Sequence, residues 1–444
     1  MIQVSPAPVF QVALKPDSLA YSLHQASFAV AAVRAGTALP QALAHVFARP
    51  EITPGARGAI QDISYRCMRS LGLTDSLITL LASKPPQPEQ LHSLLNCALT
   101  LLVNEDESGY DGFTVVNQAV DAAAANPTLM HTKGVVNAIL RRFLRERASL
   151  IPEATKTPPG TWNYPTWWID RLKSAYPEQW QSILYSGNQM PPLTLRVNRR
   201  RSSVEDYLRI LASQGIAARQ VGPWAVRLEK PLPVHQIPGF VDGLASVQDA
   251  AAQMAAPLLD VADGMRVLDA CAAPGGKTGH LLECADLDVL ALDHDPKRLQ
   301  RIDENLQRLQ LQAQLTAGDA RHGAGGWWDG KPFDRILADV PCTASGIVRR
   351  HPDIRWLRRK SDTAQLATLS SQILDNLWQM LQRDGKLLLV TCSLWPQESE
   401  QQAAAFAHRH NAIRLPAPGQ LLPTASAETD HDGLFYALFQ KTGP

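Results

Sequence analysis

Val267-Leu-Asp-Ala-Cys-Ala-Ala-Pro-Gly-Gly-Lys-Thr278 is the stretch of sequence that decides the fold. Its apolar start is typical of a buried strand, and its end is typical of the first turn of a helix. Gly275 and Gly276 allow the backbone to turn sharply and to come close to a ligand. In a doubly wound sheet, ligands bind at the carboxyl ends of the strands, where the strand order reverses. The stretch therefore predicts a ligand-binding loop in an α/β fold.

The sequence around this loop alternates short apolar runs with amphipathic runs. Strands are expected over 266–270, 289–293, 313–318, 335–339 and 386–392, and helices over 277–283, 296–309 and 364–381. Strands that alternate with helices favour a parallel, Rossmann-like sheet. The alternating tail at 433–441 is expected to add a closing hairpin.

The rest of the chain has a different pattern, which predicts three domains. Residues 1–153 show helical periodicity and no strand, which predicts an all-α bundle. One of its helices is expected to end at Gly72. Residues 154–238 read as a small α+β linking domain, and 239–444 as the α/β domain. The Trp-rich stretch at 162–180 favours core packing over base stacking.

Composition excludes several classes of protein. The 444 residues (48.6 kDa) carry 43 Lys and Arg against 42 Asp and Glu, which excludes a disordered polyelectrolyte and a uniformly basic coat protein. No apolar run is long enough to span a bilayer, and the first residues lack the pattern of a secretory signal. Six cysteines suggest neither a disulfide framework nor a zinc site. A cytoplasmic protein with free thiols, no metal and no membrane contact is expected.

Three kinds of ligand compete for the glycine loop. A phosphate-binding P-loop requires a glycine where Cys271 stands, and a nicotinamide site requires Gly-x-Gly-x-x-Gly, which is absent. A tight turn without any ligand is the third alternative. A compact nucleoside cofactor without a pyrophosphate fits best, and S-adenosylmethionine is the leading candidate. Asp293 ends the next strand, 24 residues after Asp269, where an acidic residue can hold ribose hydroxyls.

Two cysteines stand at the ends of predicted strands. Cys342 follows Asp339-Val-Pro, and Cys392 follows Thr391, so both are expected to face the crevice of the glycine loop. A thiolate is a good nucleophile, but a nearby cation must favour its ionisation. Lys277 and the arginines after Cys342 are candidates for that cation. A lone cysteine is more often a small buried apolar residue, as expected for Cys67, Cys97 and Cys284, and a redox pair is disfavoured because the Cys-x-x-Cys spacing is absent.

Several motifs together resemble those of the RNA cytosine-5 methyltransferases. In the α/β part these are the Asp269–Thr278 stretch, Asp339-Val-Pro-Cys-Thr-Ala-Ser-Gly346, Arg349-Arg-His-Pro-Asp-Ile-Arg-Trp356 and Thr391-Cys-Ser393. In the front part, Val116-Asn-Gln-Ala-Val120 and Lys133-Gly-Val-Val-Asn-Ala-Ile-Leu-Arg-Arg142 resemble the RNA-binding NusB-like module of the bacterial ribosomal RNA members. The segments at 188–198 and 243–249 are similar to the linking parts of that family. The resemblance covers nearly the whole chain.

The resemblance implies an S-adenosylmethionine-dependent enzyme that methylates carbon 5 of cytosine 967 in 16S small-subunit ribosomal RNA. It implies Cys392 as the nucleophile and Cys342 as the residue that aids product release. The implied cofactor contacts are Cys271, Ala272, Ala273, Pro274, Gly275, Gly276, Lys277, Asp293, Asp319 and Asp339. A transfer-RNA cytosine-5 methyltransferase and a non-catalytic RNA-binding assembly factor remain as alternatives.

The chemistry explains why these residue types are required. Carbon 5 of cytosine is a poor nucleophile, and addition of a thiolate to carbon 6 activates it. Asp339 is expected to stabilise the adduct at nitrogen 3, and Cys342 to help remove the proton from carbon 5. The chain is expected to act as a monomer. Three basic clusters are expected to hold RNA phosphates. The clusters are 349–360, Arg196 with 199–201, and Arg141, Arg142, Arg145 and Arg147.

Overall fold

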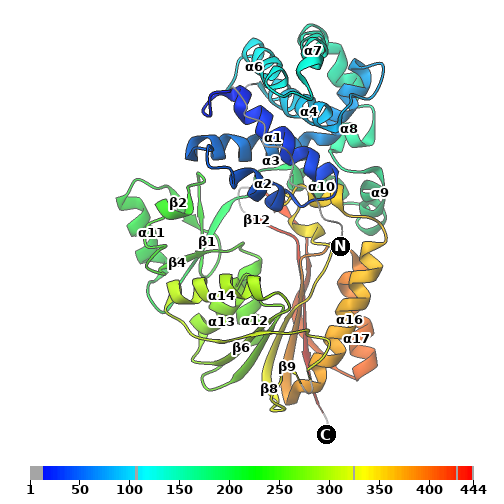
Figure 1. Ribbon diagram of the computed structural model, residues 1–444. Helices are drawn as coiled ribbons and strands as arrows, with labels where there is room; N and C mark the ends of the chain where they lie inside the picture. Colours follow the sequence, from blue (N-terminus) through cyan, green and yellow to red (C-terminus); the bar gives the residue numbers. More distant parts are fainter. Residues whose placement is uncertain (1–13, 106–108, 324–325, 427–428, 443–444) are drawn as a thin grey trace. The chain divides into compact units, whose positions relative to one another are not determined.

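The structure, a computed structural model, describes residues 14–105, 109–323, 326–426 and 429–442 (Figure 1). The chain divides into two compact units. The helical unit consists of the chain up to Trp180 together with His351–Arg358, and the sheet unit consists of Gln181–Arg350 and the chain from Arg359 onward. Within the described ranges, no helix has both the length and the apolar composition needed to cross a bilayer.

The helical unit confirms the helices expected for the front of the chain. Its helices are α1 (Leu19–Arg34), α2 (Leu39–Phe47), α3 (Pro54–Leu81), α4 (Glu89–Val103), α6 (Gly112–Ala124), α7 (Lys133–Ala154), α8 (Pro158–Trp162), α9 (Thr166–Ala175) and α15 (Ile354–Leu357). Side-chain caps define where several begin: Ser18, Thr53 and Asp111 each accept a backbone N–H at the start of a helix. Buried leucine, isoleucine and valine side chains fill the space between the helices.

The predicted helix end at Gly72 is wrong, because α3 continues through it to Leu81. A β-carbon at position 72 would lie 2.2 Å from the carbonyl oxygen of Pro159 in α8. The glycine therefore serves close helix packing rather than helix termination, and the roughly 1 kcal/mol that glycine costs inside a helix is offset by that contact.

Residues 351–358 belong to the helical unit although they lie far along the chain. The Arg355 side chain is fully buried, and its guanidinium lies 3.8 Å from the centre of the Tyr164 ring. Asp353 accepts the backbone N–H of Leu39 at 2.9 Å. Arg355 is therefore a packing residue, and its assignment to an RNA-binding cluster is wrong.

Trp168 and Tyr164 are buried as well, which confirms core packing for these two aromatic residues.

The sheet unit begins with a small α+β layer. After α10 (Trp180–Asn188) come β1 (Leu193–Val197), α11 (Val204–Ser213), β2 (Ala218–Gln220), β3 (Ala225–Leu228) and β4 (Ala245–Val247). The four strands pair antiparallel in the order β2-β3-β1-β4. Alternating residues of β1 and β3 pack against α11, as a half-buried sheet requires.

The main sheet has the order β10-β13-β9-β8-β5-β6-β7. Its strands are β5 (Arg266–Ala270), β6 (Asp288–Asp293), β7 (Gln314–Ala317), β8 (Phe333–Asp339), β9 (Leu381–Thr391), β10 (Ile413–Leu421) and β13 (Leu434–Gln440). The strands from β9 to β7 are parallel, and β13 and β10 add antiparallel neighbours. The predicted Rossmann-like class is confirmed, and β13 is the strand expected in the tail.

Helices cover both faces of this sheet. In Figure 1, α12 (Ala255–Leu259), α13 (Gly276–Cys284) and α14 (Pro296–Leu309) lie on one face, and α16 (Asp362–Met380) and α17 (Glu400–His410) lie on the other. Separate apolar clusters fill the two interfaces. The chain winds outward from β5 through β6 to β7 and then returns to β8, so the strand order reverses between β5 and β8. That reversal marks the expected ligand crevice.

Candidate active site

The glycine loop joins β5 to α13, and neighbouring side chains hold it in place. Cys271 has φ +61° and Gly275 has φ +91°, so the backbone turns sharply at both ends of the loop. The backbone N–H of Ala273 donates to Asp293 Oδ2 at 3.1 Å. Arg298 donates to the carbonyl of Ala273 at 2.8 Å and to Asp293 Oδ1 at 3.3 Å. The carboxylate at the end of β6 thus fixes the loop that follows β5.

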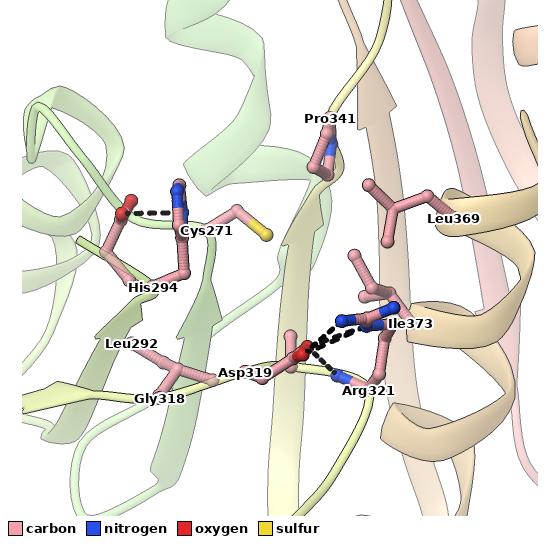
Figure 2. A pocket seen from close by; sticks show the side chains of 11 residues that line it. Cys271, Leu292, His294, Gly318, Asp319, Arg321, Pro341, Leu369 and Ile373 are labelled. Carbon is pink, nitrogen blue, oxygen red and sulfur yellow. Dashed lines mark hydrogen bonds and ion pairs between the residues drawn. The ribbon is translucent and has the colours of Figure 1, made fainter. Parts of the chain in front are cut away.

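A cavity of about 260 Å³ opens beside this loop (Figure 2). It is lined by Cys271, Leu292, Asp293, His294, Gly318, Asp319, Ala320, Arg321, Pro341, Leu369 and Ile373. Figure 2 shows the Cys271 sulfur and the Leu369 and Ile373 side chains facing the cavity. Burial, followed by the nearby Asp339, Asp293 and Asp269, raises the pKa of Cys271 to about 12, so this thiol stays neutral. It can contact a ligand but is no nucleophile.

The two acidic side chains of the cavity suit a nucleoside. Asp293 is 1% exposed, and Asp319 lies in the loop that follows β7. Hydrogen bonds from Arg321 lower the pKa of Asp319 to about 2, so it is an anionic acceptor at neutral pH. Apolar walls accommodate a flat base, and the carboxylates can accept hydrogen bonds from hydroxyl or amino groups. The residues present therefore fit the adenosine part of S-adenosylmethionine, to which Asp293 and Asp319 offer carboxylate acceptors.

The structure brings the two predicted thiols together. The sulfur atoms of Cys342 and Cys392 lie 3.5 Å apart. Strands β8 and β9 are adjacent and parallel, with Asp339 opposite Val390, so the loops that follow them leave the sheet side by side. All six cysteines are free thiols, and Cys67 and Cys97 are buried as expected. In the part of the chain that the structure describes, no cluster of His, Cys, Asp and Glu could hold a metal ion.

An ion pair links the glycine loop to the same strand end. Lys277 Nζ lies 2.6 Å from Asp339 Oδ2. Burial opposes the ammonium form of Lys277, but Asp339 outweighs burial, so the pKa of Lys277 is raised and the side chain stays charged. The hydrogen bond with Cys342, burial and the charge of Asp339 raise the pKa of Cys392 well above its usual value, whereas the charge of Lys277 lowers it. Of the predicted cations, Lys277 therefore acts on the Cys392 thiol.

The arginines that follow Cys342 are paired with carboxylates of the sheet unit. Arg349 is 1% exposed, and its Nε donates to Asp432 Oδ1 at 2.6 Å. Arg350 Nη2 donates to Asp249 Oδ2 at 3.0 Å. Because these guanidinium groups are paired with buried carboxylates, their assignment to an RNA-binding cluster is wrong.

The assignment of Arg196 to an RNA-binding cluster is also wrong, and the residue has a role that the sequence did not reveal. Its fully buried guanidinium donates to the Glu283 carboxylate at 2.7 and 2.9 Å and to the carbonyl of Gly276 at 2.7 Å. The small antiparallel sheet thereby holds the start of α13, where the glycine loop ends. Arg196 supports the glycine loop, and its fully buried side chain cannot reach RNA. Its neighbours Arg199 and Arg200 are exposed.

Comparison with known proteins agrees with this geometry. The family described as 16S rRNA methyltransferase RsmB/F matches residues 256–440, and the RsmF/B-like ferredoxin-like domain matches residues 164–235. The ribosomal RNA small subunit methyltransferase B of Vibrio cholerae is 42% identical over 407 residues, covering 89% of this chain and 92% of the relative. The chain belongs to the RsmB/F family of 16S rRNA methyltransferases.

Solved structures confirm the fold of this RsmB/F family member. A crystal structure of the protein PH0851 covers 97% of this chain and 99% of its own, with a TM-score of 0.76 and 22% identity. A methyltransferase homologue from Pyrococcus horikoshii covers 64% of this chain and 97% of its own, with a TM-score of 0.55 and 27% identity. Membership in the family confirms S-adenosylmethionine as the cofactor.

Proposed function

We propose that this chain methylates carbon 5 of a single cytosine of 16S rRNA, the base at position 967, through a covalent bond between Cys392 and the base. The observation that carries the proposal is the 3.5 Å separation of the Cys342 and Cys392 sulfurs beside the Lys277–Asp339 pair. S-adenosylmethionine, when bound, supplies the methyl group.

Each of the two thiols is assigned one step. Cys392 adds to carbon 6 of the base as its thiolate, a form that the charge of Lys277 favours and that burial, Cys342 and Asp339 oppose, and carbon 5 becomes nucleophilic. After methyl transfer, carbon 5 carries both the methyl group and its original hydrogen. Cys342 takes that proton, the electron pair restores the double bond between carbons 5 and 6, and the bond to Cys392 sulfur breaks. The contact between the two sulfurs supports this division of work, since both must reach one base.

Asp339 is assigned to nitrogen 3 of the base. The adduct carries extra electron density there, and the Lys277–Asp339 pair can supply a hydrogen bond or a proton. The same pair connects the base to the loop proposed for the cofactor, formed by Cys271, Ala272, Ala273, Pro274, Gly275, Gly276 and Lys277. The target cytosine must leave its stack, or lie in a single strand, to reach the thiols.

The competing functions fit the molecule less well. An assembly factor without catalytic activity has no need for two thiols in contact at the ends of neighbouring strands. A transfer-RNA methyltransferase would use the same thiols, but the Vibrio cholerae relative is named for the small ribosomal subunit. The proposal includes three domains: a NusB-like front domain at residues 1–153 that binds RNA, a linking domain at 154–238 and the catalytic domain at 239–444. A monomer working in the cytoplasm, where ribosomal RNA is made, completes it.

Exposed basic residues supply the proposed RNA contacts once the buried arginines are removed from the clusters. Arg199, Arg200, Arg359 and Lys360 remain in the sheet unit, and Arg141 and Arg145 remain on α7. Contacts with phosphates release counterions, so affinity for RNA falls steeply with salt. Binding that does not change with salt concentration would contradict these contacts.

Bisulfite sequencing of ribosomal RNA tests the function. In a strain that lacks the gene, cytosine 967 is expected to convert, because it is unmethylated. The wild-type gene is expected to restore protection at this base, and a Cys392→Ala variant is not. Protection that persists without the gene, or that appears only in transfer RNA, would refute the proposed substrate.

A further inference from the structure

Glu398 is a buried carboxylate with no part in the mechanism above. It ends the short helix η5 (Pro396–Glu398), which follows β9, and is 2% exposed. A buried charge is costly unless it is hydrogen-bonded. Its oxygens accept hydrogen bonds from the Thr343 backbone N–H at 2.9 Å, from the Thr343 hydroxyl at 2.6 Å and from the Ser393 hydroxyl at 2.5 Å.

The donors lie next to the two thiols. Thr343 directly follows Cys342, and Ser393 directly follows Cys392. The first belongs to the loop after β8 and the second to the loop after β9. One carboxylate therefore joins two loops that are 50 residues apart in sequence.

Other contacts between the loops show how closely they fit. The backbone N–H of Gly346 donates to the carbonyl of Cys392 at 2.8 Å, and the N–H of Leu394 donates to Ser345 Oγ at 2.7 Å. A β-carbon at Gly346 would lie 3.0 Å from that Cys392 carbonyl, so the backbones are near their closest approach. The Thr343 and Ser393 hydroxyls also contact each other at 3.4 Å, and Ser345 Oγ lies 3.5 and 3.3 Å from them. The bonds to the Glu398 carboxylate, at 2.6 and 2.5 Å, are much shorter than these contacts.

We propose that Glu398 is a positioning residue that sets the separation of the Cys342 and Cys392 thiols. The inference rests on the proposed function, because only a reaction that uses both thiols needs their separation fixed. Glu398 does not touch the base. It acts through Thr343 and Ser393, which place one sulfur to attack carbon 6 and the other to take the proton from carbon 5. A displacement of about 1 Å can cost on the order of 100-fold in rate.

Glu398→Gln tests the proposal with the smallest change in shape. One carboxylate oxygen accepts both hydroxyl groups, and an amide nitrogen in its place donates and cannot accept. The matched control is Glu400→Gln, two residues along, where the carboxylate is exposed and paired with Arg414. Both variants exchange a carboxylate for an amide, and only the first alters the contact between the thiol loops.

Two readouts separate positioning from general damage. Methyl transfer to a 16S rRNA fragment gives kcat and KM, and peptide mapping after diamide treatment gives the rate of disulfide formation between Cys342 and Cys392. Diamide accepts the two electrons and two protons that the thiols lose, so this rate reports sulfur separation without any methyl transfer. We expect Glu398→Gln to lower kcat at least tenfold and to slow disulfide formation. The KM for the RNA fragment and the KM for S-adenosylmethionine are expected to stay within about twofold of the wild-type values. Glu400→Gln is expected to match the wild type in all three.

The outcomes distinguish the two proposals. A Glu398→Gln variant with wild-type kcat, or with a lower kcat and an unchanged rate of disulfide formation, overturns the positioning role. A wild-type chain that fails to methylate the fragment refutes the proposed function, whereas the disulfide readout still reports on Glu398. If Glu398→Gln does not fold, Ser393→Ala removes one donor and keeps the carboxylate. It is expected to shift kcat and the disulfide rate in the same direction, and no shift in either would overturn the proposal.

Discussion

Arg196→Met is expected to destabilise the sheet unit severely, because it leaves a buried carboxylate without its partner. The Arg196 and Glu283 side chains are 0% and 1% exposed and form two hydrogen bonds at 2.7 and 2.9 Å. Breaking a buried ion pair by removing one partner costs about 3–5 kcal/mol. The variant also loses the hydrogen bond from Arg196 to the carbonyl of Gly276, so binding of S-adenosylmethionine is expected to weaken as well.

Urea unfolding followed by circular dichroism measures this loss of stability. Arg199→Met is the matched control, since Arg199 is exposed, and its loss is expected to stay below about 1 kcal/mol. A double variant, Arg196→Met with Glu283→Leu, removes both charges and is expected to recover most of the stability. A loss below about 1 kcal/mol for Arg196→Met, or a double variant less stable than the single one, would refute the buried pair as described. A loss of RNA affinity at unchanged stability would restore Arg196 to the RNA-binding residues.

Three further predictions follow from the same structure. Lys277→Met removes the charge that lowers the pKa of Cys392, so kcat is expected to fall at neutral pH. In a pH–rate profile, the pH at which kcat rises is expected to be higher than in the wild type. Burial raises the pKa of Asp269 to about 7, so the native state keeps a proton that the unfolded chain releases above about pH 4. Stability therefore falls as pH rises from about 4 to about 7, and Asp269→Asn is expected to flatten this fall in urea unfolding measured across that range. Gly72→Ala places a β-carbon 2.2 Å from the Pro159 carbonyl and is expected to destabilise the helical unit by about 1–3 kcal/mol in thermal unfolding, and an unchanged melting temperature would contradict that contact.

The fold around the glycine loop was predictable because several local signals agree there. Strand β5 and helix α14 have the predicted bounds, since an apolar run marks the strand and Pro296 marks the start of the helix. The convergence of Cys342 and Cys392 followed from one rule, that parallel strands end at the same edge of a sheet. The predicted strand ends and the rule for parallel sheets together were enough to predict that the two thiols share one crevice.

The buried arginines were not predictable from local sequence. A run of basic residues usually indicates a solvated face. The carboxylates that pair with the buried Arg196 and Arg349 side chains lie 87 and 83 residues away in the sequence. Glu398 is missed for the same reason, because its partners come from two loops whose contact depends on the finished sheet. Gly72 resembles a helix end until α8 is in place. In each case a long-range contact outweighs the local propensity.

Covalent trapping of RNA tests the central claim most directly. A labelled 16S rRNA fragment containing cytosine 967 is incubated with S-adenosylmethionine and each cysteine variant, and then run on a denaturing gel. Cys342→Ala is expected to accumulate a protein–RNA adduct, because attack proceeds and release stalls, whereas Cys392→Ala is expected to give none. An adduct with Cys392→Ala and none with Cys342→Ala would reverse the two roles, and no adduct with either variant would contradict the covalent mechanism.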